Sequence, residues 1–158
     1  MLQRLPGFAA ALWWASLTVV GFLVVPLLFK FLPTPAMAGN MAAKLFAAQT
    51  WVSLGCGLLL LMFSSQKSHL PPAEWSKSAI VFIFFGLLLA LLSEFAVAPR
   101  IVAREDLKLW HSVGTALFVL QWVSAAAVLW RVLGGRAPAP ERPTFIRASV
   151  RPPSRPAE

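Results

Sequence analysis

The chain contains four long runs of apolar residues that are almost free of charge, and these runs restrict its fold more than any other feature. Each run has about 20 residues, and a helix of about 20 residues rises about 30 Å, the thickness of the hydrocarbon core of a bilayer. Because backbone amides in lipid must be paired within their own segment, we expect each run to form a transmembrane helix. The sequence therefore predicts an all-α, polytopic integral membrane protein, folded as a bundle of four transmembrane helices.

Prolines and charged residues separate the predicted spans. Pro33 and Pro35 are expected to end the first helix, and Pro99 the third. Pro26 lies inside the first run and is expected to leave the Phe22 carbonyl without a partner in its own helix. The spans of the predicted membrane domain, residues 1–133, are 7–29, 41–63, 78–98 and 109–133.

The start of the chain also has some features of a secretory signal. Arg4 precedes the first apolar run, and Ala36-Met37-Ala38 resembles a cleavage site. The run from Gly7 to Phe29 is longer than the apolar region of a signal peptide, which has about 7–15 residues. We therefore interpret the run as a transmembrane helix.

Composition supports the membrane assignment and limits the partners. Hydrophobic residues make up 58% of the chain and charged residues only 13%, whereas a soluble domain has about 25% charged residues. The net charge is +8, but the charges lie outside the apolar runs, so anionic lipid headgroups are the expected partner and nucleic acid is not. A homo-oligomer or a membrane protein partner is also possible.

The last part of the chain, 134–158, has a different character. It is rich in proline and arginine and carries few apolar residues. Such a segment cannot bury enough surface to offset the entropy of ordering, so we expect a disordered basic tail. With four spans, the N-terminus, the middle loop and this tail share one side, which carries nine of the 14 Lys and Arg residues. The positive-inside rule then predicts that both termini are cytoplasmic.

A polar cluster is predicted at the other, outer end of the bundle. Glu94 is the only acidic residue inside an apolar run, and His111 lies at the start of the fourth run. On the fourth run, His111 and Thr115 follow helical spacing and are expected to face the interior of the bundle together. The residues of this candidate ligand or proton site are Glu94, His111, Lys44, Gln49, Arg100 and Thr115.

The role of Glu94 has three interpretations. An intramembrane carboxylate is unfavourable unless it is paired or faces water. Glu94 could pair with Lys44, Arg100 or His111 and so stabilise the packing of the outer end. It could instead share a hydrogen bond with His111 in a proton-handling or ligand-binding site. It could also simply reach the membrane interface.

The histidines limit the possible haem and metal sites. The second histidine, His69, lies in the predicted middle loop, a membrane thickness away from His111, so we do not expect bis-histidine ligation of haem within one chain. His111 with Met37 or Met41 is the remaining candidate for haem or copper. Otherwise we expect no cofactor and no metal, because the sequence shows no zinc-ligand spacing. The sequence also lacks a catalytic constellation such as a phosphate-binding loop or a nucleophile elbow, so an enzyme is not expected.

Several short motifs along the first 132 residues carry a resemblance to a known family. They are Trp14, Pro26-x-x-Phe29-x-x-Leu32, Ala38-Gly39, Phe46, Pro99-Arg100 and Leu109-Trp110-His111-Ser112. With these motifs the chain resembles the bacterial family of four-helix membrane proteins called DUF4149, which is similar to the transmembrane protein 205 family. The resemblance implies an integral protein of the bacterial inner membrane. Ser112 stands where the family often has glycine.

Three functions agree with these observations. The first is a non-enzymatic structural or partner-binding membrane component whose outer polar cluster stabilises the bundle or recognises a partner. The second is a small proton-coupled transporter or carrier that uses Glu94 and His111. The third is a haem- or copper-binding redox protein that uses His111 and a methionine.

Overall fold

Helices form all the regular structure in residues 4–65 and 74–134, which are the residues described by the computed structural model. Four of these helical stretches are long and apolar enough to cross a membrane. The prediction of an all-α, four-helix membrane protein is confirmed. The elements are α1 (Leu5–Thr18), η2 (Val19–Val24), α2 (Val25–Phe31), α3 (Pro35–Ser65), α4 (Glu74–Leu92), η3 (Ser93–Val97), α5 (Ala98–Val102) and α6 (Leu107–Gly134).

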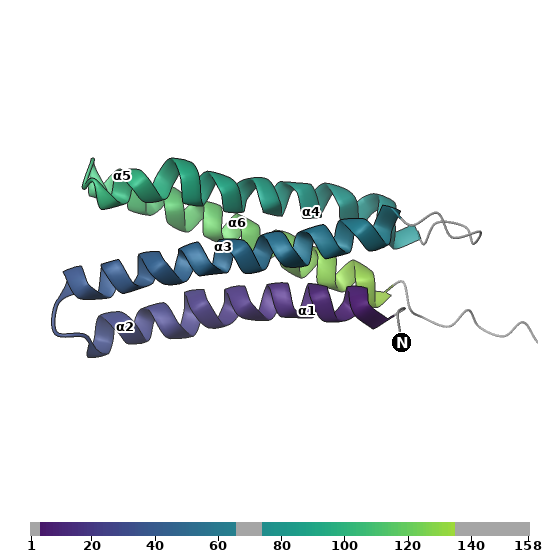
Figure 1. Cartoon of the computed structure of the whole chain (residues 1–158), viewed down its shortest axis with the longest axis horizontal. Helices are drawn as coiled ribbons and strands as arrows, with labels where there is room; N and C mark the ends of the chain where they lie inside the picture. Colours follow the sequence, from purple (N-terminus) through teal and green to yellow (C-terminus); the bar gives the residue numbers. More distant parts are fainter. Residues whose placement is uncertain (1–3, 66–73, 135–158) are drawn as a thin grey trace, which may run out of the picture.

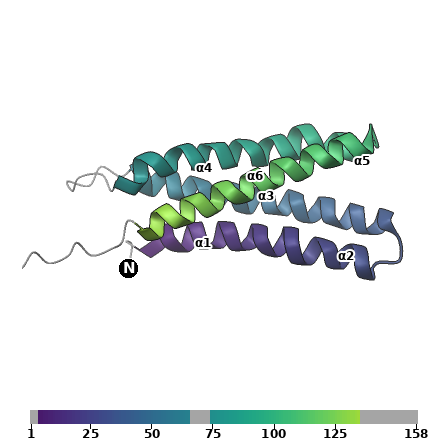
Figure 2. The ribbon, with the colours of Figure 1, turned by 180° about the vertical axis from the view of Figure 1, so that it is seen from behind.

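The helices form two antiparallel hairpins that lie along one another (Figure 1). Hairpin one comprises residues 5–65 and hairpin two residues 74–134. The short connections 32–34 and 103–106 lie at one end, here called the short-loop end, and Leu5 and Gly134 lie at the other, the terminal end. Around the bundle, α1 packs against α3, α3 against α4, α4 against α6, and α6 against α1. Figure 2 shows α6 crossing from α5 at the short-loop end to α1 at the terminal end.

The first and the third span each contain a π-helix just before a proline, Pro26 and Pro99. The amide of Val25 bonds to the carbonyl of Val20, and the amide of Ala98 bonds to that of Ser93, so each ring spans five residues. A proline lacks an N–H and its ring collides with the carbonyl four residues back, and a widened turn relieves that collision. Both spans therefore continue through their prolines. The expectation that Pro99 ends the third span was wrong, because the helix continues to Val102.

The second span begins earlier than expected. α3 starts at Pro35 rather than near residue 41, because proline suits the first turn of a helix and Thr34 caps it. The hydroxyl of Thr34 accepts a hydrogen bond from the amide of Met37 at 3.3 Å, and its carbonyl accepts one from Ala38 at 3.1 Å. Lys44 therefore does not lie in the first turn but about 14 Å along the helix.

The connection between α5 and α6 contains a strained residue that gives a first prediction. Arg104 has a φ of 58°, a conformation that is unfavourable for a residue with a Cβ by about 1–2 kcal/mol. Arg104→Gly should raise the free energy of unfolding by about 0.5–1 kcal/mol, because the extra freedom of glycine in the unfolded chain offsets part of the gain. Ala103→Gly, at a φ of −68°, should lower it. Unfolding in mixed micelles followed by circular dichroism measures both, and a loss of stability in both variants would contradict the prediction.

The hydrophobic core occupies the half of the bundle nearest the terminal end. Its largest fully buried side chains come from all four spans and include Trp13, Leu60, Ile83 and Val128. Toward the short-loop end the two hairpins separate, with α2 and α5 lying far apart (Figures 1 and 2). The middle loop, 66–73, and residues 135–158 lie outside the described residues. The predicted disorder of the tail, its contact with anionic lipids and the cytoplasmic location of the termini therefore stay predictions.

Candidate functional site

The six residues of the predicted polar cluster differ in their exposure. Gln49 is buried and Glu94 is half-buried. Gln49 lies on α3, which packs against α1, and Glu94 lies in η3, which packs against α6 and α3. The other four are exposed: Lys44, Arg100, His111 and Thr115. The expectation that His111 and Thr115 face the interior is therefore corrected, since α6 turns this side outward at the short-loop end.

The exposed members of the cluster bond mainly to their own helix or a neighbouring ring. The guanidinium of Arg100 lies 4.4 Å from the centre of the Trp110 ring and donates a 2.7 Å hydrogen bond to the carbonyl of Ala96. The hydroxyl of Thr115 donates to the carbonyl of His111 at 2.9 Å. Within the described residues, no hydrogen bond or ion pair joins the side chains of Glu94, His111 and Lys44. The structure thus does not assemble these six residues into one site.

A different set of polar residues does meet in the interior, near the middle of the bundle along its length. The side-chain nitrogen of Gln49 donates to the hydroxyl of Ser16 at 2.9 Å and to that of Ser53 at 3.5 Å. The side-chain nitrogen of Gln121 donates to Ser53 at 3.0 Å. These four residues, here called the polar belt, connect α1, α3 and α6. Gln49, Ser53 and Gln121 are each at most 5% exposed.

An aromatic cluster lies beside the polar belt on α1, η2 and α6. The indole nitrogen of Trp122 donates to the hydroxyl of Thr18 at 2.9 Å. The ring of Trp122 also packs against Trp14 and Phe22, with ring centres 5.9 Å and 5.5 Å apart. Phe46 and Phe118 meet edge to face at 5.3 Å, one turn nearer the short-loop end than Gln49 and Gln121.

The hydrogen-bond directions in the polar belt determine which atoms stay available. Ser16 and Ser53 donate their hydroxyl protons to the carbonyls of Trp13 and Gln49, both at 2.9 Å. These hydroxyls can therefore only accept from the glutamines, which orients each carboxamide with its nitrogen toward a serine. Both carboxamide oxygens are left as acceptors, and no donor among the described residues reaches them.

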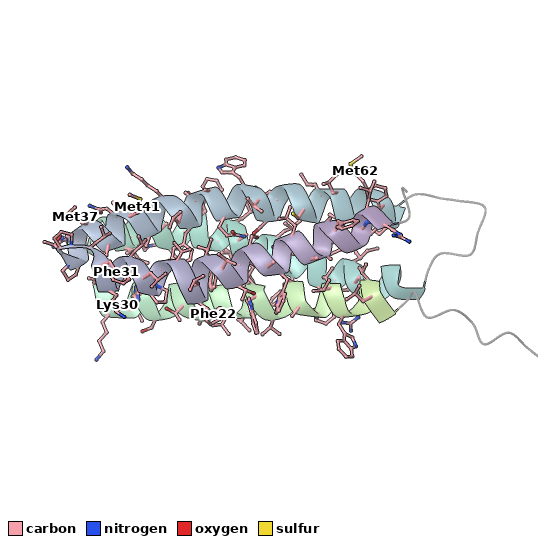
Figure 3. The ribbon with its side chains drawn as sticks, turned by 90° about the horizontal axis from the view of Figure 1, so that it is seen from below. Phe22, Lys30, Phe31, Met37, Met41 and Met62 are labelled. Atoms are coloured by element: carbon pink, nitrogen blue, oxygen red, sulfur yellow. The ribbon has the colours of Figure 1, made fainter. Side chains whose placement is uncertain are left out.

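The candidate haem or copper ligands lie at the short-loop end. Figure 3 shows Met37 and Met41 there, at the opposite end from Met62. Met37 and Met41 are about half exposed, and His111 is exposed. In residues 4–65 and 74–134, no three His, Cys, Asp or Glu side chains are grouped so that they could hold a metal ion. His69 lies outside these residues, and the haem or copper hypothesis stays a prediction.

An exposed face of α6 at the short-loop end carries mostly small and polar side chains. Its residues are His111, Ser112, Thr115, Ala116, Val119 and Leu120. The hydroxyl of Ser112 donates to the carbonyl of Lys108 at 2.9 Å, so it is satisfied within its own helix. Small side chains on this face leave room for the backbone of another helix to approach closely.

The sequence profile of the family described as Domain of unknown function (DUF4149) matches residues 8–109. The chain belongs to the DUF4149 family. The match to DUF4149 includes Ser16, Gln49 and Ser53 of the polar belt but ends before Gln121. No curated protein matches the chain, and no solved structure matches it.

Sequence reasoning missed most of the polar belt, although one signal could have identified it. The segment Leu45-Phe46-x-x-Gln49 recurs in the fourth span as Leu117-Phe118-x-x-Gln121. Each repeat places a phenylalanine and a glutamine on one helix face, because residues three apart are neighbours on a helix. A polar residue recurring in two spans at the same position relative to a phenylalanine indicates a shared position in the bundle.

Proposed function

We propose that this four-helix membrane protein is a non-enzymatic component that binds another transmembrane helix through the exposed face of α6. The composition of this exposed face is the observation that carries the proposal. At the short-loop end it consists of small and polar side chains, His111, Ser112, Thr115 and Ala116. In membrane helices, such residues favour helix–helix contact, because small side chains permit close approach and polar ones can bond across the interface.

Enlarging a small side chain on this face tests the proposal. Ala116→Leu should weaken association with a second copy, or with a co-purifying membrane protein, by about tenfold, because a larger side chain prevents close helix contact. Ala48→Leu is the matched control, since Ala48 is exposed on α3, away from α6. Sedimentation equilibrium in detergent measures self-association, and affinity purification from membranes measures the alternative. Equal effects of the two substitutions, or a protein without any partner, would contradict the proposal.

The proton-coupled carrier hypothesis receives less support from the geometry. It requires Glu94 and His111 to act together, and the described structure forms no hydrogen bond between them. His111 is exposed, whereas Glu94 is half-buried within η3. The partner-binding proposal needs no such pair, so it is the one we retain.

A further inference from the structure

The two short helices at the short-loop end, α2 and α5, are held differently. Neither contains a buried residue. α5 packs against α6, where Val97 of η3 and Ile101 of α5 lie against Gly114. α2 packs against η2 and α3, which belong to its own hairpin. Hairpin two is therefore braced at this end by contacts with α6, and α2 depends on hairpin one alone for its packing.

The hydrogen-bond ladder of the first span is interrupted where α2 begins. The amide of Val25 bonds to the carbonyl of Val20, and Pro26 has no N–H to donate. The carbonyl of Gly21 therefore receives no hydrogen bond from either residue. Helices bend at prolines and at widened turns, because the ladder is weakest there. η2 thus has the properties of a hinge between α1 and α2.

The ring of Phe118, on α6, lies against this hinge. A Cβ on Gly21 would collide with the ring, so the ring rests on the backbone of η2. The same ring meets Phe46 of α3 edge to face, with ring centres 5.3 Å apart. Beyond this point, toward the short-loop end, the two hairpins separate (Figures 1 and 2). Phe118 therefore marks where α2 parts from α6.

The antiparallel register of the first and fourth spans shows which part of α6 lies opposite α2. Thr18 accepts a hydrogen bond from Trp122, and Gly21 contacts Phe118. Both spans rise about 1.5 Å per residue, so a step of two turns along one is matched by the same step back along the other. α2 is therefore level with the first two turns of α6.

Two residues of the predicted polar cluster lie in those turns. The register brings Val25 level with Thr115, and Leu28 level with His111. His111 and Thr115 precede Phe118 by seven and three residues, so they lie on its side of α6. Both are nevertheless exposed, whereas Val25 and Leu28 are half-buried. This side of α6 is uncovered because the hairpins separate.

We propose that α2 is a lid, which pivots at η2 and closes onto the start of α6. In the closed position, Val25 and Leu28 cover Thr115 and His111. The connection 32–34 permits the movement, because three residues span about 10 Å, roughly the distance between packed helices. α3 and α6 stay in place, since the polar belt joins them.

A closed lid also regulates the exposed face of α6. Closure covers His111 and Thr115, which belong to the face that we propose for a partner helix. The lid and the partner therefore compete for these two side chains. This consequence rests on the proposed function, whereas the closure itself does not.

Double electron–electron resonance on the full-length protein in lipid nanodiscs tests the closure. Spin labels are placed at Phe31→Cys and Leu109→Cys in a Cys56→Ala background, since both positions are exposed. We expect two distance populations, a longer one from the separated hairpins and a shorter one from the closed lid. Labels at Phe8→Cys and Trp130→Cys, exposed positions near the terminal end, should give a single population.

Pro26→Ala tests the position of the hinge. Alanine supplies the missing N–H and restores the ladder, so the shorter population should be lost. Pro6→Ala is the matched control, because Pro6 lies in the first turn of α1, where proline interrupts no hydrogen bond. A single population for the Phe31–Leu109 pair, or a shorter population that persists in Pro26→Ala, would overturn the proposal.

Disulfide trapping provides a second measurement that keeps Pro26 in place. Leu28→Cys with His111→Cys should form a disulfide when diamide oxidises the protein. Leu28→Cys with Leu109→Cys should not, because Leu109 lies on the opposite side of α6. Equal yields in the two pairs, or no disulfide in the first, would also contradict the lid. A protein that closes its lid but binds no partner would contradict the proposed function alone.

Discussion

Replacing Trp13 with alanine is expected to lower the free energy of unfolding by about 3–5 kcal/mol, the usual range for truncating a fully buried aromatic side chain. Trp13 is 0% exposed and fills the space between α1, Gly86 of α4 and Ser124 of α6. Its removal leaves a cavity in the part of the bundle where all four spans meet. Unfolding with SDS in mixed micelles, followed by circular dichroism, measures the loss.

Trp130 provides the matched control for this prediction. It is 80% exposed on α6, so Trp130→Ala should change the free energy of unfolding by only about 0.5 kcal/mol. The Trp13–Gly86 contact can be isolated with a double-mutant cycle. A Cβ on Gly86 would lie 2.8 Å from the Trp13 ring, so Gly86→Ala should be destabilising by about 1–3 kcal/mol alone. It should be nearly neutral beside Trp13→Ala, and additive effects would show that the packing differs from that described.

Replacing Ser53 with alanine is expected to lower the free energy of unfolding by about 1–3 kcal/mol, because it leaves buried amide donors unpaired. Ser53 is fully buried and accepts hydrogen bonds from both Gln49 and Gln121. Without its hydroxyl, Gln121 loses the one partner of its side-chain nitrogen among the described residues. The same unfolding titration measures the effect.

Two further variants separate this contribution from the loss of a small side chain. Ser112→Ala removes an exposed hydroxyl that bonds only to the carbonyl of Lys108, so it should have little effect. Gln121→Met should recover part of the stability lost in Ser53→Ala, since the unpaired donor is then gone. A loss that persists unchanged in the double variant would contradict the role given to the polar belt.

The bounds of the helices could be predicted only in part. The apolar runs indicated four spans, but α3 begins at Pro35 and the third span continues through Pro99. A proline in a sequence reads as a break, yet it is also favourable in a first turn and tolerated after a π-helix. Which of these applies depends on the cap at Thr34 and on the widened turn of η3. The Thr34-Pro35 pair is a signal for a helix start, whereas the widened turn has no comparable signal in the sequence.

The sequence predicted how far along the bundle the candidate site residues lie, but not whether their side chains face the interior. Lys44, Gln49 and His111 were assigned to one end because the spans fix where along the bundle each residue lies. Only Gln49 faces the interior, and it bonds to Ser16 rather than to any residue of the expected cluster. The outward direction of His111 and Thr115 follows from how α6 crosses the bundle.

By itself, the sequence determined that this chain forms four membrane-length helices, because uncharged runs of that length satisfy their backbone hydrogen bonds only as helices in lipid. It could not determine which faces of those helices meet. Apolar residues surround each helix on all sides, so no amphipathic stripe marks the interior. Only the tertiary structure decided that Gln49, Ser53 and Gln121 meet at the centre, since their positions depend on how the two hairpins pack against one another.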